Sequence, residues 1–171
     1  MLTITYNNYT IKVDYDQFTD NPTGDGNYSI HETRGVRSPE LAAKLKDGYA
    51  FTIDRLEHGN VIYRLSAGVP DWDTSRDWGY IEFTDEYATN RDTYEGRKEM
   101  AAEDLKEYTA WANGECYTLH VTDPYGDDVE DISEFGIIGD YQWAIDEAKR
   151  LIDQHQPNYA VKAKRASEVH Q

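Results

Sequence analysis

Residues 2–15 read Leu-Thr-Ile-Thr-Tyr-Asn-Asn-Tyr-Thr-Ile-Lys-Val-Asp-Tyr. Apolar and polar side chains alternate on both sides of Asn7-Asn8, and a period of two is typical of strands that bury one face. Asparagine tolerates the positive φ that a two-residue hairpin turn requires. The pattern therefore predicts an antiparallel hairpin of residues 2–6 and 9–15, and with it a sheet that is assembled from hairpins.

The rest of the chain continues this pattern and adds helices. Two more hairpins and two single strands are expected, at residues 49–56 with 61–67, 117–122 with 129–135, 28–33, and 78–84. Apolar residues at helical spacing, with capping residues at the ends, predict one short helix and two main helices, at residues 39–47, 97–113 and 140–155. The predicted apolar stripes of the two main helices are Met100, Ala101, Leu105, Tyr108, Trp111 and Ala112 in the first, and Ala144, Ile145, Ala148, Leu151 and Ile152 in the second. These elements indicate an α+β fold with a mostly antiparallel sheet. We expect one domain over residues 1–156 and a flexible tail over residues 157–171.

The charge is concentrated in one part of the chain. The protein has 33 acidic and 17 basic residues, a net charge of −16. Residues 71–147 carry 22 acidic and 5 basic side chains (net −17), whereas residues 1–70 carry 9 and 7 (net −2) and residues 148–171 carry 2 and 5 (net +3). A surface of this charge repels nucleic acid and anionic membranes and attracts basic proteins. We therefore expect no direct nucleic-acid partner and no membrane partner.

Several kinds of chemistry have little support in the sequence. There is one cysteine, Cys116, so an internal disulfide is excluded, and no apolar run is long enough to cross a bilayer. Phosphate-binding glycine motifs are absent, and the five histidines are far apart in the sequence. We expect a soluble, intracellular protein with no catalytic residues, no cofactor and no metal site.

One segment partly matches a calcium-binding loop. Asp123, Asp127, Asp131 and Glu134 fall at positions 1, 5, 9 and 12 of a twelve-residue window, but positions 3 and 6 are Tyr125 and Asp128 instead of an oxygen ligand and glycine. The expected flanking elements are strands, whereas this motif needs helices. The match is weak.

The acidic stretch supplies the candidate binding residues. Glu99, Glu103 and Glu107 recur every four residues in the predicted helix 97–113, so they lie on one face. The predicted hairpin 117–135 and helix 140–155 add more carboxylates and exposed aromatic rings, at Asp123, Asp127, Asp128, Glu130, Asp131, Asp146, Glu147 and Asp153, and at Tyr125, Tyr141 or Trp143. The alternative interpretation is that these acidic residues only keep the protein soluble and bind no partner.

Residues 71–78, Asp-Trp-Asp-Thr-Ser-Arg-Asp-Trp, offer a different site. Carboxylates this close together, from Asp71 to Asp77, can act as a general acid and base or can hold a divalent ion. A structured loop with its tryptophan rings packed inward explains the same residues.

From residue 71 onward the chain resembles a group of small proteins encoded by bacteriophages and prophages. The resemblance rests on Trp72-Asp-Thr-Ser, Gly79-Tyr-Ile, Tyr108-Thr-Ala-Trp-Ala-Asn-Gly-Glu-Cys-Tyr117, Val121-Thr-Asp with Gly126, Phe135-Gly with Gly139, and Glu147-Ala-Lys-Arg-Leu-Ile-Asp153. It covers roughly half of the chain and implies a setting, a phage or mobile element, but no reaction. Ser133-Glu-Phe-Gly departs from the Cys-Trp-Gly-Phe usual in that group, and the N-terminal part has no counterpart.

These observations lead to three functional hypotheses. The first is a non-enzymatic inhibitor in the bacterial cytoplasm, an acidic nucleic-acid mimic that occupies the basic groove of a host defence nuclease such as a CRISPR effector or a restriction enzyme. The second is a small phage accessory enzyme or divalent-metal-binding protein that uses the carboxylates of residues 71–77. The third is a structural or regulatory phage protein. A homodimer is compatible with each of them.

Overall fold

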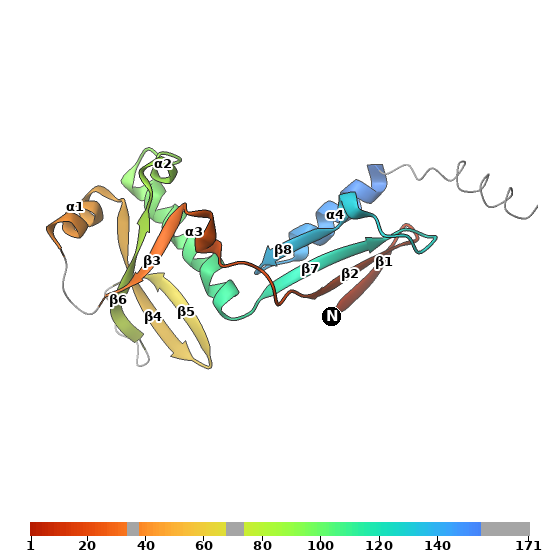
Figure 1. The fold of residues 1–171 in the computed structure, drawn as a ribbon, viewed down its shortest axis with the longest axis horizontal. Helices are drawn as coiled ribbons and strands as arrows, with labels where there is room; N and C mark the ends of the chain where they lie inside the picture. Colours follow the sequence, from red (N-terminus) through yellow and green to blue (C-terminus); the bar gives the residue numbers. More distant parts are fainter. Residues whose placement is uncertain (34–37, 68–73, 155–171) are drawn as a thin grey trace, which may run out of the picture. The chain divides into compact units, whose positions relative to one another are not determined.

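The computed structural model describes residues 1–33, 38–67 and 74–154 (Figure 1). Contacts divide the chain into two compact units, one of residues 1–16 and 117–171 and one of residues 17–116. Each unit has its own four-stranded sheet and its own core, and the α+β class with antiparallel sheets is confirmed. The single domain expected over residues 1–156 stays a prediction, and the expected tail lies outside the described residues.

The sheet of the first unit has the strand order β1-β2-β7-β8. Its elements are β1 (Leu2–Tyr6), β2 (Tyr9–Tyr15), β7 (Cys116–Thr122), the 3-10 turn η2 (Glu130–Ile132), β8 (Glu134–Ile138) and α4 (Gln142–Gln154). The hairpin β1–β2 has the predicted bounds, and Asn7 and Asn8 have φ values of 49° and 67°, as a two-residue turn needs.

Helix α4 and the inner face of this sheet form the first core. The apolar stripe predicted for this helix is the face that packs against the sheet. Four of its five members are buried, namely Ala144, Ile145, Ala148 and Ile152, and the fifth, Leu151, is partly buried. These residues meet the inward side chains of β2, β7 and β8, namely Tyr9, Ile11, Val13, Leu119, Val121 and Ile137. Alternation on the strands and the 3.6-residue period on the helix thus meet in one core.

The predicted strand 129–135 is wrong in position. Residues 130–132 form the turn η2, in which the backbone N–H of Ser133 donates to Glu130 O and the hydroxyl of Ser133 donates to Val129 O. The same hydroxyl oxygen accepts from the N–H of Val121 at 3.1 Å. The side chain of Ser133 therefore accepts the hydrogen bond from β7 that the backbone of a paired strand would otherwise accept, and β8 itself starts at Glu134.

The sheet of the second unit has the order β3-β6-β4-β5. Its elements are η1 (Pro22–Asp25), β3 (Tyr28–Glu32), α1 (Pro39–Asp47), β4 (Ala50–His58), β5 (Asn60–Leu65), β6 (Thr74–Phe83), α2 (Asp85–Ala88) and α3 (Tyr94–Ala112). Helix α1 has the predicted bounds: the Ser38 hydroxyl accepts from the N–H of Leu41, and Gly48 ends the helix at φ 75°. The short helix α2 was not predicted.

Helix α3 covers one face of this sheet and supplies much of the second core. It starts three residues before the predicted position because the Thr93 hydroxyl caps the N–H of Gly96, and it ends at Ala112, one residue before the predicted end, with Asn113 as its C-cap. Met100, Ala101 and Leu105 pack on Phe51, Ile53, Ile81 and Phe83. The predicted stripe is wrong at its end, because Ala112 is exposed and Ala110 is buried.

Candidate functional site

The three glutamates predicted on the 97–113 helix lie along α3 and are all exposed. Their spacing of four residues corresponds to a rise of about 6 Å per step. Within the described residues, none of Glu99, Glu103 and Glu107 has a basic partner at ion-pair distance. Like charges at this spacing weaken a helix by a few tenths of a kcal/mol per pair, so their arrangement does not serve the stability of α3.

The segment between β7 and β8 displays a second acidic set in the other unit. Asp127, Asp128, Glu130 and Asp131 are all exposed, and four carboxylates thus fall within five residues. The sequence between residues 108 and 147 contains no lysine or arginine. Tyr125, with 55% of its surface exposed, is the aromatic residue in this segment.

Asp123 has a local structural role. Its Oδ1 accepts hydrogen bonds from the backbone N–H of Tyr125 at 2.8 Å and of Asp127 at 3.0 Å. These bonds close the turn that follows β7, together with Gly126 at φ 85°. Asp123 shapes the loop that presents the other acids.

Two carboxylates of α4, Asp146 and Glu147, are paired along their own helix. The third, Asp153, accepts from the hydroxyl of Tyr6 at 2.9 Å and from the side-chain amide of Asn7 at 2.7 Å. Glu147 accepts from the guanidinium of Arg150, and this hydrogen bond lowers the pKa of Glu147. Asp146 lies 3.6 Å from Lys149 Nζ. Trp143 is 54% exposed, whereas Tyr141 is half-buried against the ring of Tyr117. The net charge of α4 is therefore smaller than its acid content suggested.

The predicted site residues thus form two groups, one in each unit. Glu99, Glu103 and Glu107 belong to the second unit, and all the other predicted contact residues belong to the first. Within each group, residues lie near one another along a helix or a loop.

The sequence did not predict that two carboxylates in the second unit, those of Asp54 and Asp104, are buried. Asp54 is 2% exposed, and its Oδ1 accepts from the hydroxyl of Ser66 at 2.6 Å and from the backbone N–H of Asp77 at 3.0 Å. Asp104 is 8% exposed on the core side of α3. The helical spacing could have identified Asp104 as buried, because it lies three residues after Ala101 and four after Met100 and thus within the apolar stripe of α3.

Asp104 stands next to two phenols. The hydroxyl of Tyr87 donates to Asp104 Oδ1 at 3.0 Å, while Asp104 Oδ2 and the hydroxyl of Tyr28 are buried without a hydrogen-bond partner among the described residues. Burial raises the pKa of Asp104 to about 6; the bond from Tyr87 opposes this, and the charges of Glu107 and Glu103 add to it. Burial and the charge of Asp104 raise the pKa of Tyr87 to about 12.

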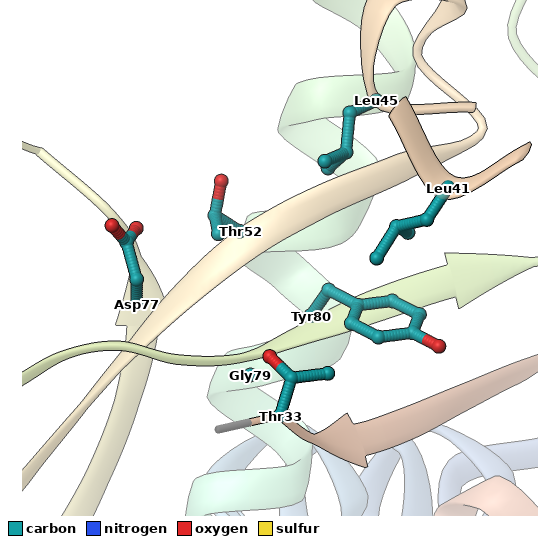
Figure 2. A pocket seen from close by; sticks show the side chains of 7 residues that line it. All are labelled: Thr33, Leu41, Leu45, Thr52, Asp77, Gly79 and Tyr80. Carbon is teal, nitrogen blue, oxygen red and sulfur yellow. The ribbon is translucent and has the colours of Figure 1, made fainter. Parts of the chain in front are cut away.

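A cavity of about 280 Å³ lies between α1 and the sheet face opposite α3. Figure 2 shows the side chains of Leu41 and Leu45 pointing from α1 toward the sheet, with Asp77 at the other side of the site. The remaining lining comes from Thr33, Thr52, Gly79 and Tyr80. The cavity is therefore lined by hydroxyls, a carboxylate and apolar groups, as many small-ligand sites are.

Asp77 is the one carboxylate of the predicted 71–77 site that can be placed in this cavity, because Asp71 and Asp73 lie outside the described part. Its φ of 45° is rare for a residue other than glycine, and the buried carboxylate of Asp54 holds its N–H in that conformation. Residues 74–78 belong to strand β6, so the loop expected over 71–78 does not extend to its end. Trp78 is partly buried and packs edge-on against Tyr63.

In the ranges 1–33, 38–67 and 74–154, no group of three or more His, Cys, Asp or Glu side chains is arranged to hold a metal ion. No helix in these ranges has the length and apolar content needed to cross a membrane. Cys116 is buried at the start of β7. No family model, curated protein or solved structure matches the chain.

Proposed function

We propose that this protein is a non-enzymatic inhibitor that binds the basic groove of a nucleic-acid-binding protein, with a host defence nuclease such as a CRISPR effector or restriction enzyme as the target. The proposal rests on one observation, the row of exposed carboxylates at Asp127, Asp128, Glu130 and Asp131, in a stretch of the sequence (residues 108–147) that contains no lysine or arginine. Its setting is the cytoplasm of a bacterial cell that carries a phage or prophage.

The electrostatics favour this kind of partner. Each strand of B-DNA presents one charge per about 3.4 Å of axis, and a groove that binds it is lined with lysine and arginine. The α3 face offers a charge about every 6 Å, and the β7–β8 loop offers four within five residues. This density is lower than that of a duplex but of the same sign, and it is enough to attract a basic groove at low salt.

The aromatic residues beside these acids supply the short-range part of the contact. Tyr125 lies within the acidic loop, and Trp143 lies on α4 of the same unit; both have more than half of their surface exposed. Tyrosine and tryptophan are frequent anchors at protein interfaces because they bury a large area at a small entropic cost.

The test is capture of a nuclease by the full-length protein from a bacterial lysate with defined defence systems, followed by elution with salt or with competing duplex DNA. Elution of a basic nuclease by both agents is the expected result. The variant Asp127→Lys, Asp128→Lys, Asp131→Lys should lose this binding. Binding unchanged in that variant, and also in Glu99→Lys, Glu103→Lys, Glu107→Lys, contradicts the proposal.

A matched control separates local contact from overall charge. Asp20, Asp25 and Asp47 are exposed acids outside both acidic sets, and their conversion to lysine changes the net charge by the same six units, from −16 to −10. This control should keep most of its affinity. Equal losses in control and test variants would point to net charge alone.

A second candidate function is ligand binding in the cavity under α1. The strained backbone of Asp77, fixed by the buried Asp54, favours it, since such strain is often found at functional sites. The test is a thermal-shift titration with Mg²⁺, Mn²⁺ and Ca²⁺. A saturable shift that Asp77→Asn abolishes supports a divalent-ion site, and no shift with any of the three ions argues against it.

A further inference from the structure

The two sheets have four edge strands, and they differ in how their outer backbone groups are protected. The edges are β1 and β8 in the first unit and β3 and β5 in the second. An edge strand exposes a row of N–H and C=O groups that another strand can pair with, and proteins usually block such edges with charges, bulges or covering elements. The strand that lacks these devices is a candidate for pairing.

Strand β5 is covered by side chains of α3. The amide of Asn113 accepts from the N–H of Val61 at 2.9 Å and donates to the Val61 carbonyl at 2.7 Å. The hydroxyl of Thr109 accepts from the N–H of Tyr63 at 3.0 Å and donates to its carbonyl at 3.3 Å. The outward backbone groups of Val61 and Tyr63, in the middle of β5, are therefore already satisfied.

Strands β3 and β8 carry charge or irregular backbone. β8 begins with the exposed Glu134 and contains Gly136 at φ 69°, a conformation that interrupts a regular ladder. β3 contains His31 and ends with the exposed Glu32. Both features oppose the addition of another strand.

In the part of the chain that the structure describes, strand β1 shows none of these devices. Its sequence, Leu-Thr-Ile-Thr-Tyr, contains no charge, no proline and no glycine. In a two-residue hairpin the residues that flank the turn exchange hydrogen bonds, so Tyr6 and every second residue before it, Ile4 and Leu2, bond to β2. The N–H and C=O groups of Thr3 and Thr5 consequently point away from β2. Both residues are exposed, and within the described residues nothing pairs with them.

The hairpin that contains β1 has no net charge, in contrast to the rest of the chain, and next to Tyr6 the carboxylate of Asp153 and the ammonium group of Lys149 on α4 offset one another in charge. The hairpin of residues 2–15 has two charged side chains, Lys12 and Asp14, which form an ion pair at 2.5 Å. A second copy of the chain, although it carries −16 overall, can thus approach this edge without placing like charges opposite one another.

We propose that β1 pairs antiparallel with β1 of a second copy, so that the two four-stranded sheets of the first units join into one sheet. In the register that uses all the outward groups, Thr3 of one copy pairs with Thr5 of the other, and the two-fold axis passes between the two Ile4 residues. The same register sets Leu2, 37% exposed in one copy, beside Tyr6 of the other. This inference depends on the edge of β1 and not on the proposed function.

The first test is sedimentation velocity of the full-length protein over a range of concentrations. Five-residue strands with four shared hydrogen bonds give a small interface, so we expect a dimer with a Kd on the order of 10–100 µM. Because the contact is neutral and each copy carries −16 overall, raised salt should not weaken the dimer, whereas it should weaken the binding of a basic partner by the acidic sets.

The matched variants are Thr5→Pro and Thr5→Ser. Proline at position 5 removes an N–H that points outward, so it keeps the β1–β2 ladder but prevents pairing across the edge. Serine retains that N–H. We expect Thr5→Pro to be monomeric with an unchanged circular dichroism spectrum, and Thr5→Ser to form the dimer like the parent protein.

A crosslink fixes the register independently of the proline variant. Ile4→Cys places two thiols across the two-fold axis in a non-hydrogen-bonded pair, where Cα atoms are about 4.5 Å apart, within the range of a disulfide. The native Cys116 is buried and does not compete. A disulfide-linked dimer should form on mild oxidation. A protein that stays monomeric at all concentrations, a dimer that persists in Thr5→Pro, or the lack of the crosslink overturns the proposal.

Discussion

The hydroxyl of Tyr87 donates a 3.0 Å hydrogen bond to Oδ1 of Asp104, while the second oxygen of this buried carboxylate has no partner among the described residues. The pair joins the end of α2 to the core side of α3. A carboxylate with one unsatisfied oxygen inside a core opposes folding when it is ionised. This relationship makes stability depend on pH.

Replacing Asp104 with asparagine should stabilise the protein at pH 8 and have little effect at pH 4.5. Because the pKa of Asp104 is about 6 in the folded state, against 3.8 ordinarily, the native protein binds more protons than the unfolded chain between these values. Its free energy of unfolding therefore falls as pH rises from about 4 to 6, and the lost stability is on the order of 2 kcal/mol above that range. Urea unfolding of both proteins at the two pH values measures the difference.

Tyr87→Phe should act in the opposite direction. It removes the one hydrogen bond to the Asp104 carboxylate and should lower the unfolding free energy at pH 8 by about 1.5–3 kcal/mol, as for other bonds to charged groups. The loss should be smaller at pH 4.5, where Asp104 is protonated. An equal loss at both pH values would show that packing of the Tyr87 ring, and not the bond, is responsible.

Gly79→Ala should prevent stable folding of the second unit. A Cβ at this position would lie 2.0 Å from the backbone oxygen of His31, so β3 and β6 could not keep their pairing. We expect a loss of at least about 4 kcal/mol or insoluble protein, detected by thermal unfolding. Gly24→Ala is the control: its Cβ would meet no atom within 4 Å, and the melting temperature should change little.

Asn113→Ala should destabilise the edge of β5. The substitution leaves the N–H and C=O of Val61 without their partners on α3, which costs about 1–3 kcal/mol if water does not replace them. Chemical unfolding measures the loss, and hydrogen exchange at Val61 should speed up. An unaltered exchange rate at Val61 would contradict this role for Asn113.

Asn8→Gly should stabilise the β1–β2 hairpin. Asn8 has φ 67°, which glycine adopts without the strain that a side chain brings, and Asn-Gly is the preferred pair for this turn. We expect a gain of about 0.5–1 kcal/mol, and a loss of similar size in Asn8→Ala. If both variants melt at the same temperature, the turn does not limit the stability of the first unit.

Local sequence signals predicted most of the elements. Asn7-Asn8 between alternating strands, Ser38-Pro39 with Gly48, and Asn113-Gly114 each mark an element end by backbone chemistry that acts within a few residues. The exposure of Glu99, Glu103 and Glu107 followed from the helical period in the same way. Prediction failed where a residue distant in the sequence determines the end of an element. The hydroxyl oxygen of Ser133 accepts from the N–H of Val121, twelve residues away, and β8 therefore starts later than its sequence suggests.

What the sequence alone determined is the α+β class, the hairpin of residues 2–15, the positions of α1, α3 and α4, and the concentration of negative charge after residue 71. These depend on periodicity, turn residues and composition. Only the tertiary structure decided that Asp54 and Asp104 are buried, that α3 side chains cover the edge of β5, and that no strand among the described residues pairs with the outer edge of β1. Burial and edge protection depend on which segments meet in space, and contacts between residues far apart in sequence leave no local pattern to read.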